Sequence, residues 1–393
     1  MIFQVLDNKK ECYAVYHGET LYHYPPKDLK LTHTWNFTPH FSDNKIEYAQ
    51  FWCEGKSLSN VCPEHLKAKW ADLTKKARAF STSFRNAKIN LNDVCFYDLV
   101  PRNFLVDYCK MKTEITNWVF EHHKKPANSD FLIELAGLLH DIKGQQLNMR
   151  AENLDFIDEK VRKSFGKVKN ANNYIEYNLW GTATGRLTTT ANSFPILTLN
   201  RELRRILVPN NDLYMELDFN SAELRTLFAL LGEKQPKEDI HSWINENIFG
   251  GSSDRDKTKK RVFSWLYNPK AKNKKLNEYL RRDDLLNKYY HDGLIHTPFK
   301  RKIEVGEEKA LNYLVQSTAS DIFLRAVLKI HDLLKTRKTN IAFCIHDSVV
   351  IDLAKEDKPL LQEILDVFSK TCYGDFKVNL SLGKDFGTMR KVL

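Results

Sequence analysis

The chain has 393 residues, of which 42% are hydrophobic, and this length allows two or three packed domains or lobes. Lys and Arg outnumber Asp and Glu by 60 to 50, and the sequence pI is about 9.0, which favours a polyanionic partner such as nucleic acid. Seven cysteines without a C-x-x-C pair argue against a zinc module. Without a membrane-length apolar run or a signal peptide, the sequence predicts a cytoplasmic protein with reduced thiols and no membrane partner.

Residues 1–105 have the pattern of a small mixed α/β domain. The stretch from Val15 to Tyr22 is typical of a β-hairpin, and the stretch from Tyr48 to Cys53 is typical of a strand. Residues Glu64 to Phe84 have the periodicity and charge of a basic helix.

Residues 106–173 are predicted to be mostly helical. Apolar residues recur at helical spacing from Leu105 to His122 and again from Asp130 to Ile142, with a loop at Lys124 to Asn128 between them. This pattern indicates a helical hairpin. The basic, polar stretch from Lys160 to Asn173 is interpreted as a connector or a phosphate-facing segment.

A strand passes directly into a helix near Asp218. Apolar residues alternate with polar ones from Leu213 to Phe219, and helical spacing begins after Asn220-Ser221, where either residue is a suitable helix cap. A carboxylate at the end of a strand, beside exposed N–H groups of a helix start, is well placed to hold a cation and a phosphate together. The same pattern also fits a capped junction with a solvated aspartate.

A basic stretch between Asp254 and Lys275 carries an ordered stripe of side chains. Arg255, Lys259 and Phe263 are four residues apart, so on a helix they lie within a sector of roughly 80°. One face then presents cations followed by aromatic rings, which suits the phosphates, sugar and base of a nucleoside triphosphate. The alternative is a solvated basic helix whose aromatic residues belong to the core.

Asp347 is predicted to sit at the tip of a tight hairpin. Apolar strands are expected at Asn340 to Ile345 and Val349 to Leu353, with His346-Asp347-Ser348 as the turn between them. Together with Asp218, such a carboxylate could hold two divalent ions about 3.5–4 Å apart, as phosphoryl transfer requires. The alternative is that Asp347 is simply a turn former.

Six motifs in order resemble the polymerase domain of family A DNA polymerases, the bacterial polymerase I class. The resemblance covers about residues 174–390, and the compact form is most similar to phage or environmental-virus members. The motifs are Thr182-Ala-Thr-Gly-Arg-Leu-Thr188, Asp218-x4-Glu223-Leu-Arg225, Asp239-Ile-His241, Arg255-x3-Lys259-x3-Phe263-x3-Tyr267, Asn312-x3-Gln316-x-Thr318-Ala-x-Asp321 and His346-Asp347.

The resemblance implies an α+β right-hand polymerase fold, with an antiparallel-sheet palm, helical fingers and a helical thumb. On this basis residues 106–173 are expected to form the thumb, 174–232 and 307–393 the palm, and 233–306 the fingers. A long helix from Glu307 to about Thr336 is expected to contact the DNA duplex. Residues 1–105 would be an inactive exonuclease remnant or an accessory domain, since the Asp-x-Glu of a proofreading site is missing. The alternative for this region is that carboxylates such as Asp93 and Asp98 form a functional site of an unfamiliar kind.

The resemblance also implies a role for each motif residue. Two Mg²⁺ ions, with Mn²⁺ as a possible substitute, would be held by Asp218 and Asp347, and Lys259 would act as general acid. Glu223 would block a ribose 2′-OH and pair with Tyr267. The incoming dNTP would be bound by Arg255, Lys259, Phe263, Tyr267, His241 and Glu223, and the DNA would be contacted by Arg186, Asn312, Gln316, Arg225, His346 and Thr184.

The implied function is DNA-templated DNA synthesis from a primer 3′-OH without intrinsic proofreading, in replication or repair of a phage or viral genome. The expected partners are primer–template DNA and dNTPs, with a separate exonuclease, helicase or processivity factor as possible additions to a monomer in the host cytoplasm. A single-subunit RNA polymerase and a non-catalytic DNA-binding relic are the alternatives. The sequence departs from the family pattern at Ser221, Ser264, Asn268, Glu308 and Ser348.

Overall fold

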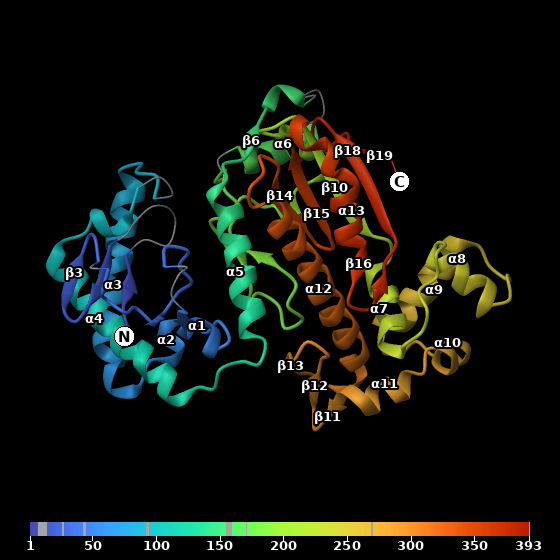
Figure 1. The fold of residues 1–393 in the computed structure, drawn as a ribbon, viewed down its shortest axis with the longest axis horizontal. Helices are drawn as coiled ribbons and strands as arrows, with labels where there is room; N and C mark the ends of the chain where they lie inside the picture. Colours follow the sequence, from blue (N-terminus) through green and yellow to red (C-terminus); the bar gives the residue numbers. More distant parts are fainter. Residues whose placement is uncertain are drawn as a thin grey trace. The chain divides into compact units, whose positions relative to one another are not determined.

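The computed structural model describes residues 1–6, 14–25, 27–41, 45–91, 94–154, 159–169, 171–268 and 270–392. Asp7, Asp43 and Asp93, which bear on the predicted loss of an exonuclease site, lie outside these residues. The chain divides into two compact units, Met1–Gly144 and Gln145–Leu393 (Figure 1). None of the helices in the described ranges is both long and apolar enough to cross a membrane.

Two long helices organise the first unit, namely α3 (Glu64–Asn86) and α4 (Arg102–His122). Trp70 of α3 and Ile115 of α4 are buried in one apolar cluster. The side chain of Gln4 donates a hydrogen bond of 3.1 Å to Thr116 and so ties β1 to α4. The other elements are β1 (Gln4–Val5), β2 (Val15–His17), β3 (Thr20–Tyr22), β4 (His33–Thr34), β5 (Glu47–Tyr48), α1 (Ala49–Trp52), α2 (Leu58–Val61) and α5 (Ser129–Gly144).

Several local predictions in this unit are confirmed and one is wrong. The hairpin from Val15 to Tyr22 and the basic helix from Glu64 are present. The strand predicted from Tyr48 to Cys53 is instead α1, whose turn closes with a 3.1 Å bond from the amide of Cys53 to the carbonyl of Ala49. Buried residues alternate over this stretch, but six residues are too few to separate a strand from one helical turn.

The boundary between the units differs from the predicted domain boundary at residue 106. Both α4 and α5 belong to the first unit, because α4 packs on α1, α2 and α3. The predicted helices from Leu105 and Asp130 are themselves present. The stretch from Lys160, interpreted as a connector, is largely the helix α6 (Glu159–Val168).

A five-stranded antiparallel sheet in the order β14-β15-β10-β18-β19 is the base of the second unit. Phe219 of β10 stacks on Phe368 of α13 with ring centroids 4.3 Å apart, and α13 packs in turn on the long helix α12. Apolar side chains of β10 and α13 therefore contribute to the core of this unit. These elements are β10 (Leu213–Phe219), α12 (Glu307–Leu334), β14 (Asn340–Ile345), β15 (Ser348–Leu353), α13 (Leu361–Ser369), β18 (Val378–Gly383) and β19 (Arg390–Lys391).

A helical region between α7 and α12 has its own apolar core. Trp265 and Val262 of α9 pack there with Phe228 of α7 and Ile240 of α8. The elements are α7 (Ala222–Leu231), α8 (Ile240–Asn247), α9 (Arg255–Tyr267), α10 (Lys274–Tyr279), α11 (Arg282–Tyr289), β11 (Tyr290–His291), β12 (Leu294–His296) and β13 (Lys302–Glu304). Short strand pairs complete the unit, with β6 (Asn148–Met149), β7 (Tyr177–Asn178), β8 (Thr188–Thr189), β9 (Leu207–Val208), β16 (Lys370–Thr371) and β17 (Gly374–Asp375).

Candidate active site

Asp218 lies near the end of the central strand β10, where three strands meet. It pairs directly with Ser348 of β15 and with Asn379 of β18. The side-chain amide of Asn379 donates a 3.0 Å hydrogen bond to Oδ2 of Asp218. Burial, with the nearby charge of Asp347 as the next cause, raises the pKa of Asp218 to about 7, although the bond from Asn379 opposes this.

Asp347 occupies the predicted turn between β14 and β15. The last pair of the hairpin is Ile345 with Ser348, so His346 and Asp347 form a two-residue loop. His346 has a left-handed φ of +53°, which allows so tight a turn, and both loop residues are exposed. The charge of Asp347 raises the pKa of Asp218 and of Glu223, so the fold brings these three carboxylates into one electrostatic neighbourhood.

Among the described residues, no three His, Cys, Asp or Glu side chains gather in an arrangement that could hold a metal ion. The donor set nevertheless suits Mg²⁺, which is usually bound through one or two carboxylates, several waters and substrate phosphates. Asp218 on β10 and Asp347 in the turn before the adjacent strand β15 offer those two carboxylates. The site therefore fits a hard divalent cation that reaches full coordination only with substrate.

Glu216 is a further carboxylate of this region that sequence reasoning missed. The buried hydroxyl of Ser348 donates a 3.1 Å hydrogen bond to Oε1 of Glu216. The negative charge of Glu216 is also one of the causes that raise the pKa of Asp218. Glu216 and Asp218 are two residues apart on one strand, and this spacing was the available signal, because such residues share a face.

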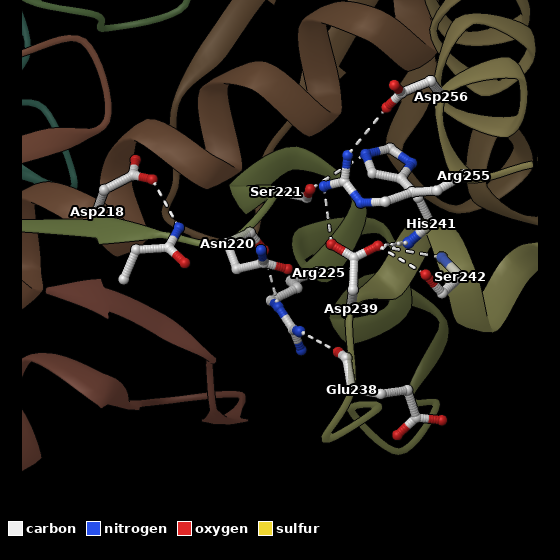
Figure 2. A network of polar contacts seen from close by, with 11 residues as sticks. Asp218, Asn220, Ser221, Arg225, Glu238, Asp239, His241, Ser242, Arg255 and Asp256 are labelled. Atoms are coloured by element: carbon white, nitrogen blue, oxygen red, sulfur yellow. Dashed lines mark hydrogen bonds and ion pairs between the residues drawn. The ribbon is translucent and has the colours of Figure 1, made fainter. Parts of the chain in front are cut away.

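A polar network links the end of β10 to α8 and α9 (Figure 2). Oδ1 of Asp239 accepts bonds from the backbone amides of His241 and Ser242, each 3.1 Å long, and thereby caps α8. Oδ2 of Asp239 accepts a 2.9 Å bond from Nη2 of Arg255 at the start of α9 (Figure 2). One carboxylate thus positions both predicted phosphate-binding segments.

His241 is fully buried, and a 3.2 Å hydrogen bond joins its Nε2 to Oγ of Ser221. The helix α7 begins where predicted, with Ser221 as the residue before its first turn, but Ser221 has a left-handed φ of +56° and its hydroxyl makes no capping bond. Burial, together with the charges of Arg255 and Lys259, lowers the pKa of His241 to about 4 against the effect of Asp239. Nδ1 of His241 is buried and has no hydrogen-bond partner among the residues that the structure describes.

The stripe predicted on α9 is a single face. Nζ of Lys259 lies 5.7 Å from the ring centroid of Phe263, and the rings of Phe263 and Tyr267 stack with centroids 5.7 Å apart. Arg255 and Lys259 are exposed and Phe263 is half-buried, whereas Trp265 turns into the core. The structure therefore agrees with an ordered row of two cations and two rings.

Glu223 and Gln316 connect α7, α12 and the loop before β8. Arg186 donates a short hydrogen bond to Oε1 of Glu223, and the hydroxyl of Thr184 donates a 2.8 Å bond to Oε1 of Gln316. Burial raises the pKa of Glu223, and the charge of Arg186 opposes the shift. The predicted partner of Glu223 was Tyr267, but in this structure the carboxylate pairs with Arg186. Asn312 lies half-buried on α12, one turn before Gln316.

Comparison with known proteins shows which family has similar sequences. A sequence model of DNA polymerase family A matches residues 283–389, which include α12 and the hairpin with Asp347. The chain is 23% identical over 296 residues to DNA polymerase I of Chloroflexus aurantiacus and 25% identical over 273 residues to the thermostable DNA polymerase I of Thermus filiformis. These matches cover 62% and 56% of this chain. Over these regions the chain is similar to DNA polymerases of family A.

The fold of the chain agrees with this similarity. A solved POL domain of Pol1 from M. smegmatis, in complex with DNA primer–template and dNTP, matches with a TM-score of 0.61 at 12% identity. The match covers 88% of this chain and 82% of that one, and it establishes the α+β polymerase-domain fold. The chain spans about a third of the length of the curated relatives, 31% and 32% in the two cases above.

Two of the predicted DNA contacts are buried. The prediction that Arg225 touches DNA is corrected, because its guanidinium is fully buried and donates to the backbone carbonyls of Asn220, Pro236 and Glu238 at 2.8–3.1 Å (Figure 2). Burial lowers the pKa of Arg225 to about 10. Thr184 is only 4% exposed, so its hydroxyl positions Gln316 rather than facing DNA.

An ion pair inside the polymerase domain joins Arg301 to Asp321 of α12. Nε of Arg301 lies 2.8 Å from Oδ2 and Nη2 lies 2.8 Å from Oδ1, and the aspartate side chain is fully buried. Burial raises the pKa of Asp321, while the bonds from Arg301 oppose this. Gly185 has a φ of +75°, and a Cβ there would lie 2.6 Å from the guanidinium carbon, so this glycine lets the loop carrying Arg186 reach the pair.

Proposed function

We propose that this protein is a DNA-directed DNA polymerase that extends a primer 3′-OH with dNTPs and releases pyrophosphate. The observation that carries the proposal is the closeness of Asp218 on β10 to Asp347 in the turn before β15, where the next residue, Ser348, pairs directly with Asp218. From this end of the sheet the Ser221–His241 bond leads to the stripe on α9. A carboxylate pair and a row of cations within one compact unit are the groups that phosphoryl transfer requires.

Two Mg²⁺ ions held by Asp218 and Asp347 would supply activation of the primer hydroxyl and charge neutralisation on the phosphates. The chain's own cations do the rest of the electrostatic work. Arg255 and Lys259, both exposed on α9, bind the β- and γ-phosphates of the incoming nucleotide. Lys259 then gives a proton to the pyrophosphate oxygen that leaves the α-phosphorus.

His241 acts as a neutral hydrogen-bond donor to the triphosphate. With its pKa lowered to about 4, the imidazole carries no charge near neutral pH. Its Nδ1 is buried without a partner, and on Figure 2 the ring lies beside Arg255. An unpaired buried nitrogen is costly, and a phosphate oxygen delivered by the nucleotide would satisfy it.

Glu223, Phe263 and Tyr267 select the sugar. The Glu223 side chain is 12% exposed and is held by Arg186, so a ribose 2′-OH pressed against it would lose water without gaining space. The two stacked rings on α9 offer a platform for the sugar and base. This arrangement favours dNTPs over NTPs.

Primer–template DNA is bound along α12 and the β14–β15 hairpin. Asn312 and Gln316 are one turn apart on α12, and His346 is exposed in the hairpin beside Asp347. Together with Arg186 these side chains read minor-groove acceptors, which occur in every correct base pair and so report fit rather than sequence. The same proposal includes the assignment of palm, fingers and thumb, the absence of proofreading and a phage or viral role.

Primer extension on a matched and a mismatched primer end tests the proposal directly. We expect wild-type protein with Mg²⁺ to extend the matched primer and to leave the mismatched end untrimmed. Asp218→Ala and Asp347→Ala should abolish extension while DNA binding persists. Glu304→Ala, which removes an exposed carboxylate on β13 of the same unit, is the control and should extend normally. Normal extension by either aspartate variant would refute the assignment.

A further inference from the structure

Glu216 shares a sheet face with Asp218, and its surroundings set it apart from an ordinary surface carboxylate. On β10 the two side chains are two positions apart and point to the same side of the sheet. No Lys or Arg of the described chain forms an ion pair with Glu216, although the group is half-buried beside other carboxylates. The charge of Lys391 on β19 acts to lower the pKa of Asp218 and so offsets part of the repulsion between the carboxylates. The repulsion that remains is destabilising, and a divalent ion reduces that cost.

Ser348 fixes the direction of the Glu216 carboxylate. Its hydroxyl is 6% exposed, donates 3.1 Å to Oε1 of Glu216, and belongs to the residue paired directly with Asp218. Asp347 is the adjacent residue in the chain. The bond therefore holds the Glu216 carboxylate toward Ser348, on the side of the sheet where Asp218 lies and next to Asp347.

We propose that Glu216 is a positioning residue for the Mg²⁺ or Mn²⁺ ions at Asp218 and Asp347, an inference that rests on the proposed function. Mg²⁺ dehydrates reluctantly and keeps several waters, so a nearby carboxylate accepts hydrogen bonds from metal-bound water and adds negative charge. Loss of such an outer partner typically weakens metal binding by about 10–100-fold. Glu216 would accept these hydrogen bonds from its position on β10, and the hydroxyl of Ser348 would fix the orientation of its carboxylate.

Mn²⁺ binding tests this role without turnover. The full chain is mixed with a dideoxy-terminated primer–template and the next correct dNTP, and free Mn²⁺ is counted by electron paramagnetic resonance. Glu216→Gln keeps an oxygen for the Ser348 hydroxyl but removes the charge, so we expect the Kd for Mn²⁺ to rise by about tenfold or more. Glu304→Gln removes the same charge from β13 and should leave the Kd unchanged.

A charge-relocation variant separates positioning from folding. Because residue 348 pairs directly with Asp218, Glu216→Ala combined with Ser348→Glu returns a carboxylate to the same face from the neighbouring strand. We expect this double variant to bind Mn²⁺ within about threefold of wild type, whereas Glu216→Ala alone stays weak. A wild-type Kd for Glu216→Gln, or no recovery in the double variant, would overturn the inference. If Asp218→Ala also binds Mn²⁺ normally, the proposed function itself fails instead.

A different observation in the first unit supports a second inference. A hollow of about 380 Å³ lies along α3, lined by Ser59, Cys62, Lys67, Trp70, Ala71, Thr74, Lys75 and Arg78. Its lining contains three cations, two hydroxyls and no carboxylate. Lys67 pairs with Glu64, but no carboxylate within the described ranges pairs with Lys75 or Arg78.

Six of the lining residues belong to α3, and Ser59 and Cys62 precede it in the chain. At 100° per residue, Lys67, Thr74 and Arg78 fall within about 40° of one another, and the small side chains of Ala71 and Thr74 leave the hollow between the cations. Lys67 and Arg78 are about 16 Å apart along the axis at 1.5 Å per residue, a span that covers several phosphates of one strand. Lys69 and Lys76 lie on the opposite side of the same helix.

From this charge complementarity we infer that the hollow on α3 binds the sugar–phosphate backbone of a DNA strand. The test uses fluorescence anisotropy of the full chain with a labelled primer–template across a salt series. We expect Lys75→Glu/Arg78→Glu to weaken binding at least tenfold and to reduce the log–log salt slope by about 2, near 0.9 for each lost phosphate contact. Lys69→Glu/Lys76→Glu makes the same charge change on the opposite side and should bind within about twofold of wild type.

Equal losses in the two double variants, or no loss in either, would overturn the inference, because net charge alone would then explain the result. Thermal unfolding of both variants shows whether α3 still packs. Because the readout is binding, a wild-type protein that binds DNA but does not extend primers would refute the proposed function and leave this test intact. A single-stranded probe and a blunt duplex, used in parallel, report which form of the strand the hollow takes.

Discussion

Asp239 holds Arg255 by a 2.9 Å contact between Oδ2 and Nη2, while its other oxygen caps α8. Bonds from Arg255 and the amide of Ser242 outweigh burial and hold the pKa of Asp239 well below its usual range. The side chain that anchors Arg255 is therefore also the one that fixes the helix carrying His241. The two segments that are predicted to bind phosphate therefore depend on a single carboxylate.

Asp239→Asn and Asp239→Ala should separate these two roles. Asn keeps the cap but loses the charge, so we expect the KM for dNTP to rise roughly fivefold, about 1 kcal/mol, with little change in kcat. Ala should cost about 1 kcal/mol more in unfolding free energy, because the cap is lost as well. Steady-state kinetics and denaturant unfolding of both variants check this, and equal stability of the two would contradict the capping role.

The lowered pKa of Asp239 also predicts how stability depends on pH in acid. Because the folded-state pKa of Asp239 is depressed, its stabilising contribution is present above the unfolded pKa near 3.8 and is lost as the pH falls below about 4. Wild-type protein should therefore lose stability more steeply than Asp239→Asn below that pH. Unfolding free energies measured from pH 6 down to pH 3 decide this, and parallel curves would count against the ion pair as a source of stability.

The effect of pH on stability through Asp218 has the opposite sign to the effect through Asp239. Its folded-state pKa is raised to about 7, so in metal-free protein the folded state loses stability as the pH rises from about 4 to 7. Asp218→Asn should then melt higher than wild type at pH 8, by about 2–4 °C for each 1 kcal/mol of penalty removed, and the gap should narrow toward pH 4. Thermal melts with and without Mg²⁺ check this, since Mg²⁺ should raise only the wild-type curve.

Glu223 is expected to control sugar selection. Glu223→Ala removes the carboxylate that Arg186 holds and opens space for a 2′-OH, so the ratio of NTP to dNTP incorporation should rise at least about tenfold, equivalent to 1.4 kcal/mol. Glu233→Ala is the control, because Glu233 is exposed just beyond the end of α7 and pairs with Arg281 at 2.9 Å. An unchanged ratio in Glu223→Ala would remove this side chain from the selection of sugar.

The Arg301–Asp321 pair should matter far more to stability than a surface pair. Asp321→Ala leaves a buried guanidinium without its partner and should cost about 3–5 kcal/mol in unfolding free energy. Asp332→Ala breaks the exposed pair with Lys335 and should cost less than about 1 kcal/mol. Denaturant unfolding of the two variants checks the contrast, and similar costs would mean that burial of Asp321 is not decisive.

Local sequence patterns were sufficient for the elements that carry the site. The alternation around Leu217 and the hairpin around Asp347 are short-range signals, and the structure has both strands where they were predicted. The spacing of Arg255, Lys259 and Phe263 likewise follows from helix geometry alone, so the stripe on α9 was predictable. The strand predicted from Tyr48 failed because six residues carry too little periodicity.

Only the tertiary structure decided how polar side chains are paired. Arg225 follows Asp218 by seven residues, yet it is fully buried among backbone carbonyls, and Ser221 bonds His241 instead of capping α7. Glu216 and Ser348 meet across two strands that are 132 residues apart in sequence. Periodicity reports which face a residue occupies, but a hydrogen bond depends on which distant segment covers that face, and that is set by the packing of the whole domain.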